Sequence, residues 1–421
     1  MSPCQTEDME PGRKAVSVAV ASLIIFTLGS AYAVSAWNNE VKDMLHMTQT
    51  EITTVTSCFT FGQYMAILGG FFNDHFGVRW STISSAISLA VLYWTAATLV
   101  NSPTAPHWWL AVVFGFIGVS HAFPSIAAIS ATEGLYGKAH RGKVMGVLSA
   151  SFSGGGAVFA VVYHRWFDHQ VSAYFTFLAY AFFAVCLVGA ITFKPTVHPK
   201  ETDLPSTQPD EVTPLQANDD ITLLPLLRTS RFWYLFVSVL VGVGAPLFVM
   251  NNLSFLVESN HGDMSQVSTL VLIFSLVNLL GRFVMGAVSD AFVSTIPRSR
   301  FLSGSIAFVG VTQLLFIVVP VTYIVVPVVL TGFAEGCIFG LFPVLIRELF
   351  GARHFGKNYG LIGLANAVGF PLILGPLSSA LYRLQLTPGT EKCFGSSCFM
   401  PMFFITATLS VIAFVCSTRL R

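Results

Sequence analysis

The chain has 421 residues, of which 54% are hydrophobic and only 10% are charged. Soluble domains carry roughly 25% charged residues, so this composition identifies an integral membrane protein. Its 22 basic and 21 acidic residues give a net charge of +1. That balance offers no polyanion-binding surface and excludes nucleic acid as a partner.

Twelve apolar runs are long enough to cross a bilayer as helices, which takes about 20 residues each. The first run is too long for a signal-peptide core and lacks a cleavage site, so we interpret it as a spanning helix. The first six runs lie near residues 15–37, 49–72, 81–100, 108–131, 143–162 and 171–193. The second six lie near residues 232–256, 266–289, 301–319, 322–346, 357–383 and 399–418. The pattern predicts an all-α membrane protein whose twelve transmembrane helices form two bundles of six.

The two groups of runs predict four parts of the chain. A polar, proline-bearing stretch separates the groups, and it is too poor in apolar residues to pack, so we expect a mobile linker. The parts are a cytosolic N-terminal tail (1–14), an N-terminal six-helix bundle (15–193), a cytosolic linker (194–231) and a C-terminal six-helix bundle with a short tail (232–421).

The basic residues outside the predicted spans gather on one side of the membrane, and this bias sets the orientation. With the N-terminus in the cytosol, only Lys42, Arg165, Arg383 and Lys392 fall on the outer side. Both termini are therefore expected in the cytosol. The plasma membrane is the favoured location, and an endolysosomal or other organelle membrane is the alternative.

The linker contains Asp219 followed by Leu223 and Leu224, a spacing that fits an acidic dileucine sorting signal. Such a signal would direct the protein to endolysosomal membranes. The alternative is that these leucines begin a short amphipathic segment that leads into the seventh spanning helix.

A short motif occurs twice, once after the second predicted helix and once at the end of the eighth. The first copy fits G-x-x-x-D-x-x-G-x-R, and the second repeats its first part. The residues are Gly70, Asp74, Gly77 and Arg79 in the first copy, and Gly286 and Asp290 in the second. The repeat resembles the signature loop of the major facilitator superfamily. That resemblance implies two pseudo-symmetric six-helix halves related as parallel repeats.

The motif predicts a conformational latch. Gly70 would let another helix approach closely, and Asp74 could meet Arg79 or the positive N-terminus of a neighbouring helix. In the second copy the expected glycine and arginine are absent, so its positive charge would come from Arg298 or Arg300. The alternative is that both loops are only tight turns between adjacent helices.

Other segments resemble a narrower branch of the superfamily. RTSRFWYLF, NNLSFLVES, IRELFGARHFGKNYG and CFGSSCFMPMFF are similar to nodulin-like proteins, which are relatives of the monocarboxylate transporters. The R-x-x-M-G segment that starts at Arg282 is similar to one in the eighth helix of monocarboxylate transporters. That resemblance implies that Arg282 binds a substrate carboxylate. Those carriers have an aspartate four residues earlier, where this chain has Asn278.

The resemblance also implies that helices 1, 4, 7 and 10 line a central cavity. His121 in helix 4 and Glu335 in helix 10 lie close to the centres of their spans, and Arg282 lies somewhat toward the cytosol. A guanidinium in hydrocarbon costs at least roughly 2.5–3.5 kcal/mol, so Arg282 requires a partner, a water-filled cavity or a ligand.

Glu335 is the first candidate partner. Glycines repeat every four residues around it, at Gly332, Gly336 and Gly340. This small-residue face suits close packing, which would press one side of helix 10 against a neighbour and turn Glu335 elsewhere. We weigh three roles for Glu335: an ion pair with Arg282, a proton or substrate site, and a group that simply faces water. If the two are paired, an anion that binds Arg282 would free Glu335 to take up a proton.

His121 precedes Pro124 by three residues, so it could simply bond to the backbone that this proline loosens. Its functional alternative is a proton relay or a hydrogen bond to substrate. Asn251 and Asn252 in helix 7 and Tyr32 in helix 1 lie toward the outer ends of their spans. They could form an outer gate, contact substrate, or anchor the helices at the membrane interface.

Two further features are structural candidates. The triplet Gly154 to Gly156 in helix 5 indicates either a tight packing seam or a point of bending. Cys393 and Cys398 lie in the outer loop before helix 12, where an oxidising exterior or lumen permits a disulfide.

Together these features predict a secondary-active or facilitative transporter of a small organic solute that works by alternating access. A monocarboxylate such as pyruvate or lactate is the favoured substrate. A co-transported proton is a further candidate partner. The alternatives are an amino-acid or metal-ion (iron) carrier of the same fold, or a membrane sensor that transports nothing. We expect no enzyme activity, cofactor or bound metal, because no P-loop, H-E-x-x-H or G-x-S-x-G motif stands in a span. The expected partners are the solute and the lipid bilayer, and an accessory subunit is not predicted either way.

Overall fold

The computed structural model describes residues 10–47, 49–102, 106–137, 140–168, 170–193, 223–263, 266–386 and 393–420. Most of the predicted tail and linker, including Asp219, lies outside the described residues. Leu224 begins a four-residue helix that leads toward the seventh span. The sorting-signal alternative therefore stays a prediction.

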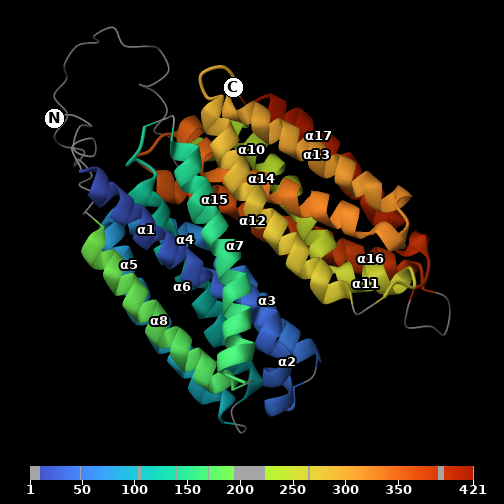
Figure 1. Cartoon of the computed structure of the whole chain (residues 1–421), viewed down its shortest axis with the longest axis horizontal. Helices are drawn as coiled ribbons and strands as arrows, with labels where there is room; N and C mark the ends of the chain where they lie inside the picture. Colours follow the sequence, from blue (N-terminus) through green and yellow to red (C-terminus); the bar gives the residue numbers. More distant parts are fainter. Residues whose placement is uncertain are drawn as a thin grey trace.

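Twelve helices in the described part are long and apolar enough to span a membrane, which confirms the predicted architecture. Figure 1 shows them as two groups, one from each half of the chain. The first half contains α1 (Pro11–Leu28), η1 (Gly29–Ala33), α2 (Val34–Met44), α3 (Gln49–Tyr64), α4 (Ala66–Phe76), α5 (Val78–Val100), α6 (His107–Thr132), α7 (Arg141–Trp166) and α8 (Val171–Thr192). The second half contains α9 (Leu224–Leu227), α10 (Ser230–Asn251), α11 (Leu253–Ser259), α12 (Val267–Ala291), α13 (Arg298–Val318), η3 (Val321–Tyr323), α14 (Val325–Phe350), α15 (Phe355–Ala367), η4 (Val368–Leu374), α16 (Gly375–Leu384), η5 (Ser396–Cys398) and α17 (Met400–Thr418).

Four spans are interrupted, whereas the apolar runs alone predicted continuous helices. The first passes from α1 through the 3₁₀ segment η1 into α2, and the second breaks at Met65 between α3 and α4. The seventh breaks at Asn252, and the eleventh contains the π-helical segment η4 with Pro371 inside it. Pro371 cannot donate the backbone hydrogen bond that a regular helix needs, which contributes to the last interruption.

The glycine triplet of α7 forms a packing seam, one of the two alternatives for it. A Cβ atom on Gly155 would lie 1.9 Å from the carbonyl oxygen of Phe26, and one on Gly29 would lie 2.1 Å from the carbonyl oxygen of Phe152. Neither position has room for a side chain. The backbones of α1, η1 and α7 therefore touch directly, which fixes the first cavity wall.

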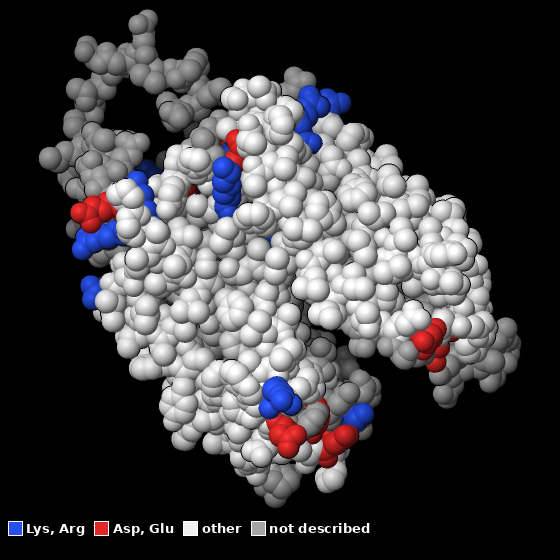
Figure 2. All heavy atoms as spheres, viewed as in Figure 1, with Lys and Arg blue, Asp and Glu red and all other residues white. Residues whose placement is uncertain are grey.

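The two ends of the molecule carry most of the charged side chains seen in Figure 2. With twelve spans, both termini and the turns that follow even-numbered spans lie at one end, which we call the terminal face. Figure 2 shows that charged side chains concentrate toward the two ends and that a broad uncharged band separates them. Exposed apolar residues such as Trp94, Val161 and Val411 lie on the spanning helices, where their chemistry suits contact with lipid.

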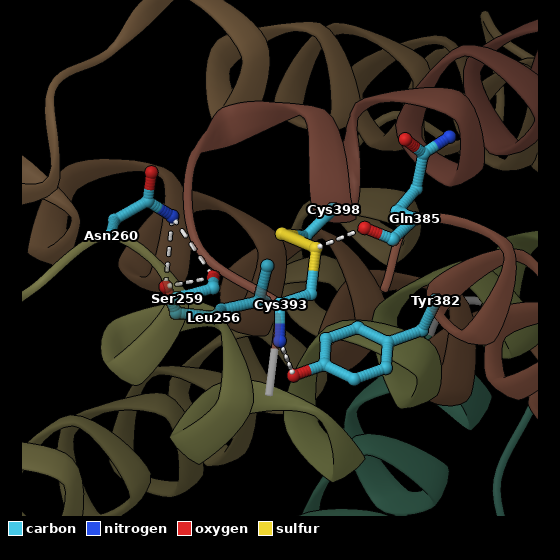
Figure 3. Close-up of a disulfide and its surroundings, with 7 residues drawn as sticks. All are labelled: Leu256, Ser259, Asn260, Tyr382, Gln385, Cys393 and Cys398. Atoms are coloured by element: carbon cyan, nitrogen blue, oxygen red, sulfur yellow. Dashed lines mark hydrogen bonds between the residues drawn. A yellow bond between two sulfur atoms is a disulfide. The ribbon is translucent and has the colours of Figure 1, made fainter. Parts of the chain in front are cut away.

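A disulfide joins Cys393 and Cys398 at the end opposite the terminal face (Figure 3). The loop that it closes is also held by other spans. The backbone N–H of Gly395 donates to the carbonyl oxygen of Ser259 on α11 over 2.7 Å, and that of Cys393 donates to the Tyr382 hydroxyl on α16 over 2.9 Å. The loop thus connects the ends of the seventh, eleventh and twelfth spans that lie opposite the terminal face.

Candidate functional site

A cavity opens between the two halves, with an empty volume of about 1090 Å³ that is partly open to solvent. Figure 2 shows the molecule hollowed between the halves at the end opposite the terminal face. The lining is mostly apolar, with a few polar side chains from both halves. These are Tyr32, Gln63, Tyr64, His121, Ser125 and Ser149 from the first half, and Arg282, Tyr359 and Asn366 from the second.

Arg282 lies in this lining on α12, and its side chain is only 3% exposed. Its Nε donates to Asn278 Oδ1 over 2.8 Å. Its Nη1 donates to the carbonyl oxygen and to Oγ of Ser149, over 3.1 and 3.0 Å. The guanidinium also lies over the Phe339 ring, 4.3 Å from its centroid. Two of its nitrogens are therefore fixed by the protein, one of them from the opposite half.

Glu335 is equally buried, at 3% exposed, but it does not pair directly with Arg282. In the described part of the chain, Asn278 stands between them: its Nδ2 donates to Glu335 Oε2 over 2.8 Å while its Oδ1 accepts from Arg282. Of the three roles weighed for Glu335, the direct ion pair is thus replaced by a bridged one. A carboxamide suits the bridging position because it both donates and accepts, which an ionised carboxylate cannot do.

The glycine face of α14 packs against α12, the helix that carries Arg282. A Cβ on Gly336 would lie 2.1 Å from the carbonyl oxygen of Asn278, and one on Gly340 would lie 2.5 Å from that of Arg282. We expected this packing to turn Glu335 elsewhere. Instead Glu335 reaches Asn278 on the same neighbouring helix, because it directly precedes Gly336 and the two backbones lie so close.

His121 is bound by side chains, not by the backbone near Pro124, which corrects that alternative. Gln63 Nε2 lies 3.2 Å from His121 Nδ1, and the Tyr93 hydroxyl lies 3.3 Å from Nε2. The ring is 4% exposed and lines the cavity. It is therefore held in one orientation on the wall of the first half.

The structure separates the three residues predicted at the outer ends. Tyr32 lines the cavity together with Arg282, and its ring packs edge-on against Phe152. The side chains of Asn251 and Asn252 instead donate back to carbonyl oxygens of their own helix, over 2.8 and 2.9 Å. Neither asparagine is among the residues that line the cavity.

At the terminal face, Asp74 caps a helix of the opposite half. Its two carboxylate oxygens accept from the backbone N–H groups of Gly356 and Lys357, over 3.2 and 2.9 Å, at the start of α15. A Cβ on Gly70 would lie 2.2 Å from the carbonyl oxygen of Gly356, so only glycine allows this approach. The predicted alternative with Arg79 is corrected: that side chain is exposed and has no hydrogen bond to Asp74 in the described part of the chain.

Asp290 makes the corresponding contact from the second half. It accepts from the backbone N–H groups of Gly142 and Lys143 over 2.8 and 2.7 Å, at the start of α7. It also accepts from Arg298 Nη2 over 2.6 Å, so Arg298 is the basic partner of this copy. Gly286 meets the backbone of Gly142 in the same way that Gly70 meets Gly356. Gly77, at φ 83°, forms the turn in the first copy.

An additional ion pair joins the halves at this face, between Arg347 on α14 and Glu133 at the end of α6. Sequence reasoning did not find it, nor did it find the cavity residues Ser149, Tyr359 and Asn366. Ser149 and Asn366 are single polar residues within apolar runs, so the sequence pattern does not distinguish them. Only their contacts in the structure show that they line the cavity.

Neutralising Asp74 is expected to weaken the contact at the terminal face. A carboxylate at a partly buried helix N-terminus contributes up to ~2 kcal/mol, so Asp74→Asn should shift the balance between closed and open forms of this face roughly tenfold. Spin labels on the α4–α5 and α14–α15 turns would show a new, longer distance population. The control is Asp43→Asn, at an exposed position on α2. Equal distance distributions in the two variants would contradict a latch.

Two pseudo-symmetric bundles of six spanning helices, with a partly polar cavity between them, define the class of membrane solute transporters. The model of the Major Facilitator Superfamily matches residues 16–253 and 246–421. The chain therefore belongs to the Major Facilitator Superfamily.

Relatives and solved structures agree with this family. The chain is similar to "Probable transporter MCH1" of Wickerhamomyces anomalus, at 23% identity over 98% of this chain and 88% of the relative. It is also similar to an uncharacterized MFS-type transporter, YhjX, of Escherichia coli, at 24% identity over 82% of each. FucP in its outward conformation has a TM-score of 0.66 at 17% identity, over 97% of this chain and 99% of FucP. The human organic anion transporter MFSD10 has a TM-score of 0.66 at 15% identity, over 97% and 100%. At such identities the structures show the fold alone.

Proposed function

We propose that this transporter is a secondary-active or facilitative carrier of a small monocarboxylate, such as pyruvate or lactate. The observation that carries the proposal is the state of Arg282. It is a buried cation in the cavity lining whose Nε and Nη1 are held by Asn278 and Ser149. That leaves Nη2 for a ligand or for the Tyr32 hydroxyl, which belongs to the same lining.

A carboxylate suits this site better than other small anions or neutral solutes. The guanidinium is a charged donor, and its remaining Nη2 group can give two N–H hydrogen bonds to a carboxylate, an attraction that the mostly apolar lining strengthens. The Phe339 ring lies against the guanidinium and limits its movement. Among the described residues that line the cavity none is acidic, so an incoming carboxylate meets Arg282 without direct competition.

The contacts at the terminal face support transport by alternating access. Asp74, Asp290 and Glu133 each join one half to the other at that face, while the cavity is reached from the opposite end. With the termini in the cytosol, as the basic residues predict, this is an outward-facing form. The proposed location is the plasma membrane, with an organelle membrane as the alternative.

The bridge through Asn278 supports coupling to a proton. A substrate carboxylate at Arg282 would neutralise the positive charge that stabilises ionised Glu335 through Asn278. Glu335 would then bind a proton more readily, and the two would cross the membrane together. This coupling needs no direct contact between the two charges.

Two other candidates remain within reach of the same site. An amino acid also presents a carboxylate to Arg282, so an amino-acid carrier is the second candidate. A cation such as iron would instead need Glu335 and His121, which bond to different neighbours. No group of three or more His, Cys, Asp or Glu residues in the described ranges could hold a metal ion.

Uptake into liposomes by the purified chain tests the proposal directly. Labelled pyruvate, lactate, alanine and ferrous iron would be offered with and without an inward proton gradient. We expect saturable uptake of the monocarboxylates, several-fold faster with the gradient if the proton is coupled. Uptake of alanine alone or iron alone would favour the corresponding alternative. Saturable binding with neither net flux nor exchange would indicate a sensor.

A further inference from the structure

Asn366 is a buried polar residue that the proposed function does not use. It lies near the end of α15, is 7% exposed and belongs to the cavity lining. Its Oδ1 atom is buried without a hydrogen-bond partner in the described part of the chain. A buried amide oxygen in this condition is costly unless water or a ligand completes its bonding. Because Asn366 belongs to the cavity lining, a ligand in the cavity is a candidate partner for this oxygen.

The backbone that follows Asn366 is held against a neighbouring span. The π-helical segment η4 begins two residues later, and such segments are frequent at functional sites. A Cβ on Gly369 within it would lie 2.7 Å from the carbonyl oxygen of Leu240 on α10, so the two backbones touch. The wall that carries Asn366 is therefore braced against the seventh span.

The position of Asn366 also limits the ligand. Tyr359, Gly363 and Asn366 line the cavity from one face of α15, because they are spaced three and four residues apart. Seven residues of helix extend about 10 Å, and the first of these residues, Tyr359, lines the same cavity as Arg282. The polar wall thus extends from the neighbourhood of the guanidinium, and a ligand that uses both ends needs a second polar group apart from its carboxylate.

Taken with the proposed function, on which this rests, we infer that Asn366 selects hydroxylated monocarboxylates, with the carboxylate on Arg282 and a hydroxyl group donating to Asn366 Oδ1. A hydroxyl meets the need of this atom because Oδ1 only accepts and a hydroxyl can donate. The oxo group of a 2-oxo acid cannot donate. Binding sites that hydrogen-bond a substrate hydroxyl discriminate strongly against the analogue that lacks it.

The test compares hydroxy acids with their unsubstituted parents. Uptake into liposomes would be measured for lactate with its parent propionate, and for 3-hydroxybutyrate and 4-hydroxybutyrate with their parent butyrate. The second set also shows which hydroxyl position is preferred. For Asn366→Leu we expect kcat/KM to fall at least tenfold for the preferred hydroxy acid and less than twofold for its parent. Arg282→Lys, in contrast, should lower uptake of parents and hydroxy acids alike. Gln313→Leu removes a buried amide outside the cavity lining. It should leave unchanged the ratio of kcat/KM for the hydroxy acid to kcat/KM for its parent.

A second measurement does not depend on the fold of a variant. Hydroxy acids should raise the unfolding temperature of the wild-type protein more than their parents do, at equal concentration. The role of Asn366 would be overturned if hydroxy acids and parents raised the unfolding temperature equally, or if Asn366→Leu lowered kcat/KM equally for both. Either result would leave the carboxylate proposal standing. If the wild-type protein takes up no carboxylate of the panel, the proposed function fails and the role of Asn366 falls with it.

Discussion

Arg282→Lys is expected to lower kcat/KM for monocarboxylate uptake roughly 100-fold, which corresponds to about 2.7 kcal/mol. A lysine carries the same charge but presents a single donor group in place of a planar fork. It cannot replace the contacts of Nε and Nη1 with Asn278 and Ser149 and also donate to a carboxylate, as the three nitrogens of Arg282 can. Hydrogen bonds to charged groups contribute about 1.5–3 kcal/mol each, so the loss of one such bond accounts for the effect.

The matched control for this variant is Arg79→Lys, because Arg79 is exposed at the start of α5 and does not line the cavity. It should retain wild-type uptake. The measurement is the initial rate in liposomes over a range of substrate concentrations, with the amount of folded protein checked for each variant. Full activity of Arg282→Lys toward carboxylates would contradict the assigned binding role. A loss of cation uptake with unchanged carboxylate uptake would contradict the substrate class.

Glu335→Gln is expected to abolish uptake driven by a proton gradient, with at least a tenfold loss, and to leave exchange of substrate at equal pH nearly intact. Glutamine keeps an oxygen that can accept from Asn278 Nδ2, so the bridge to Arg282 survives. It has no ionisable group, so it cannot carry a proton. In the wild type, uptake should rise as the outer pH is lowered, whereas the variant should show no such rise.

Glu258→Gln provides the control for this second variant, since Glu258 belongs to α11 and does not line the cavity. Its uptake should respond to the gradient as the wild type does. The diagnostic quantity is the ratio of gradient-driven uptake to equilibrium exchange, which cancels differences in protein amount. A normal pH response in Glu335→Gln would remove Glu335 from proton coupling. A loss of both activities would show that this carboxylate is needed for binding or folding instead.

The sequence predicted the architecture well because each spanning helix must bury its own backbone hydrogen bonds in a long apolar run. The interruptions were not predictable from the same runs. The break at Gly29 depends on contact with Gly155, more than a hundred residues away, and the break around Pro371 depends on packing against α10. Hydropathy measures how apolar a segment is and contains no information on such contacts.

The site was predictable in part, for a similar reason. The cost of burying a guanidinium singled out Arg282, and the repeated motif singled out Asp74 and Asp290. From the sequence alone, Asn278 was interpreted only as the replacement of an aspartate found in related carriers. Its bridging role depends on how closely α12 and α14 approach. Asn366 drew no attention at all, since an unpaired amide becomes visible only when all its neighbours are placed.

The glycine ladder between α12 and α14 has a consequence for the energetics of the transport cycle. Gly336 and Gly340 leave so little space that these two helices cannot slide or rotate against each other without a clash. The second half must therefore present the same guanidinium to the solute on both sides of the membrane. Ser149 of the first half holds Arg282 in this form, so a movement of the first half against α12 would change the bonding of the guanidinium and with it the affinity on each side. Such a difference would set the direction in which the carrier works best.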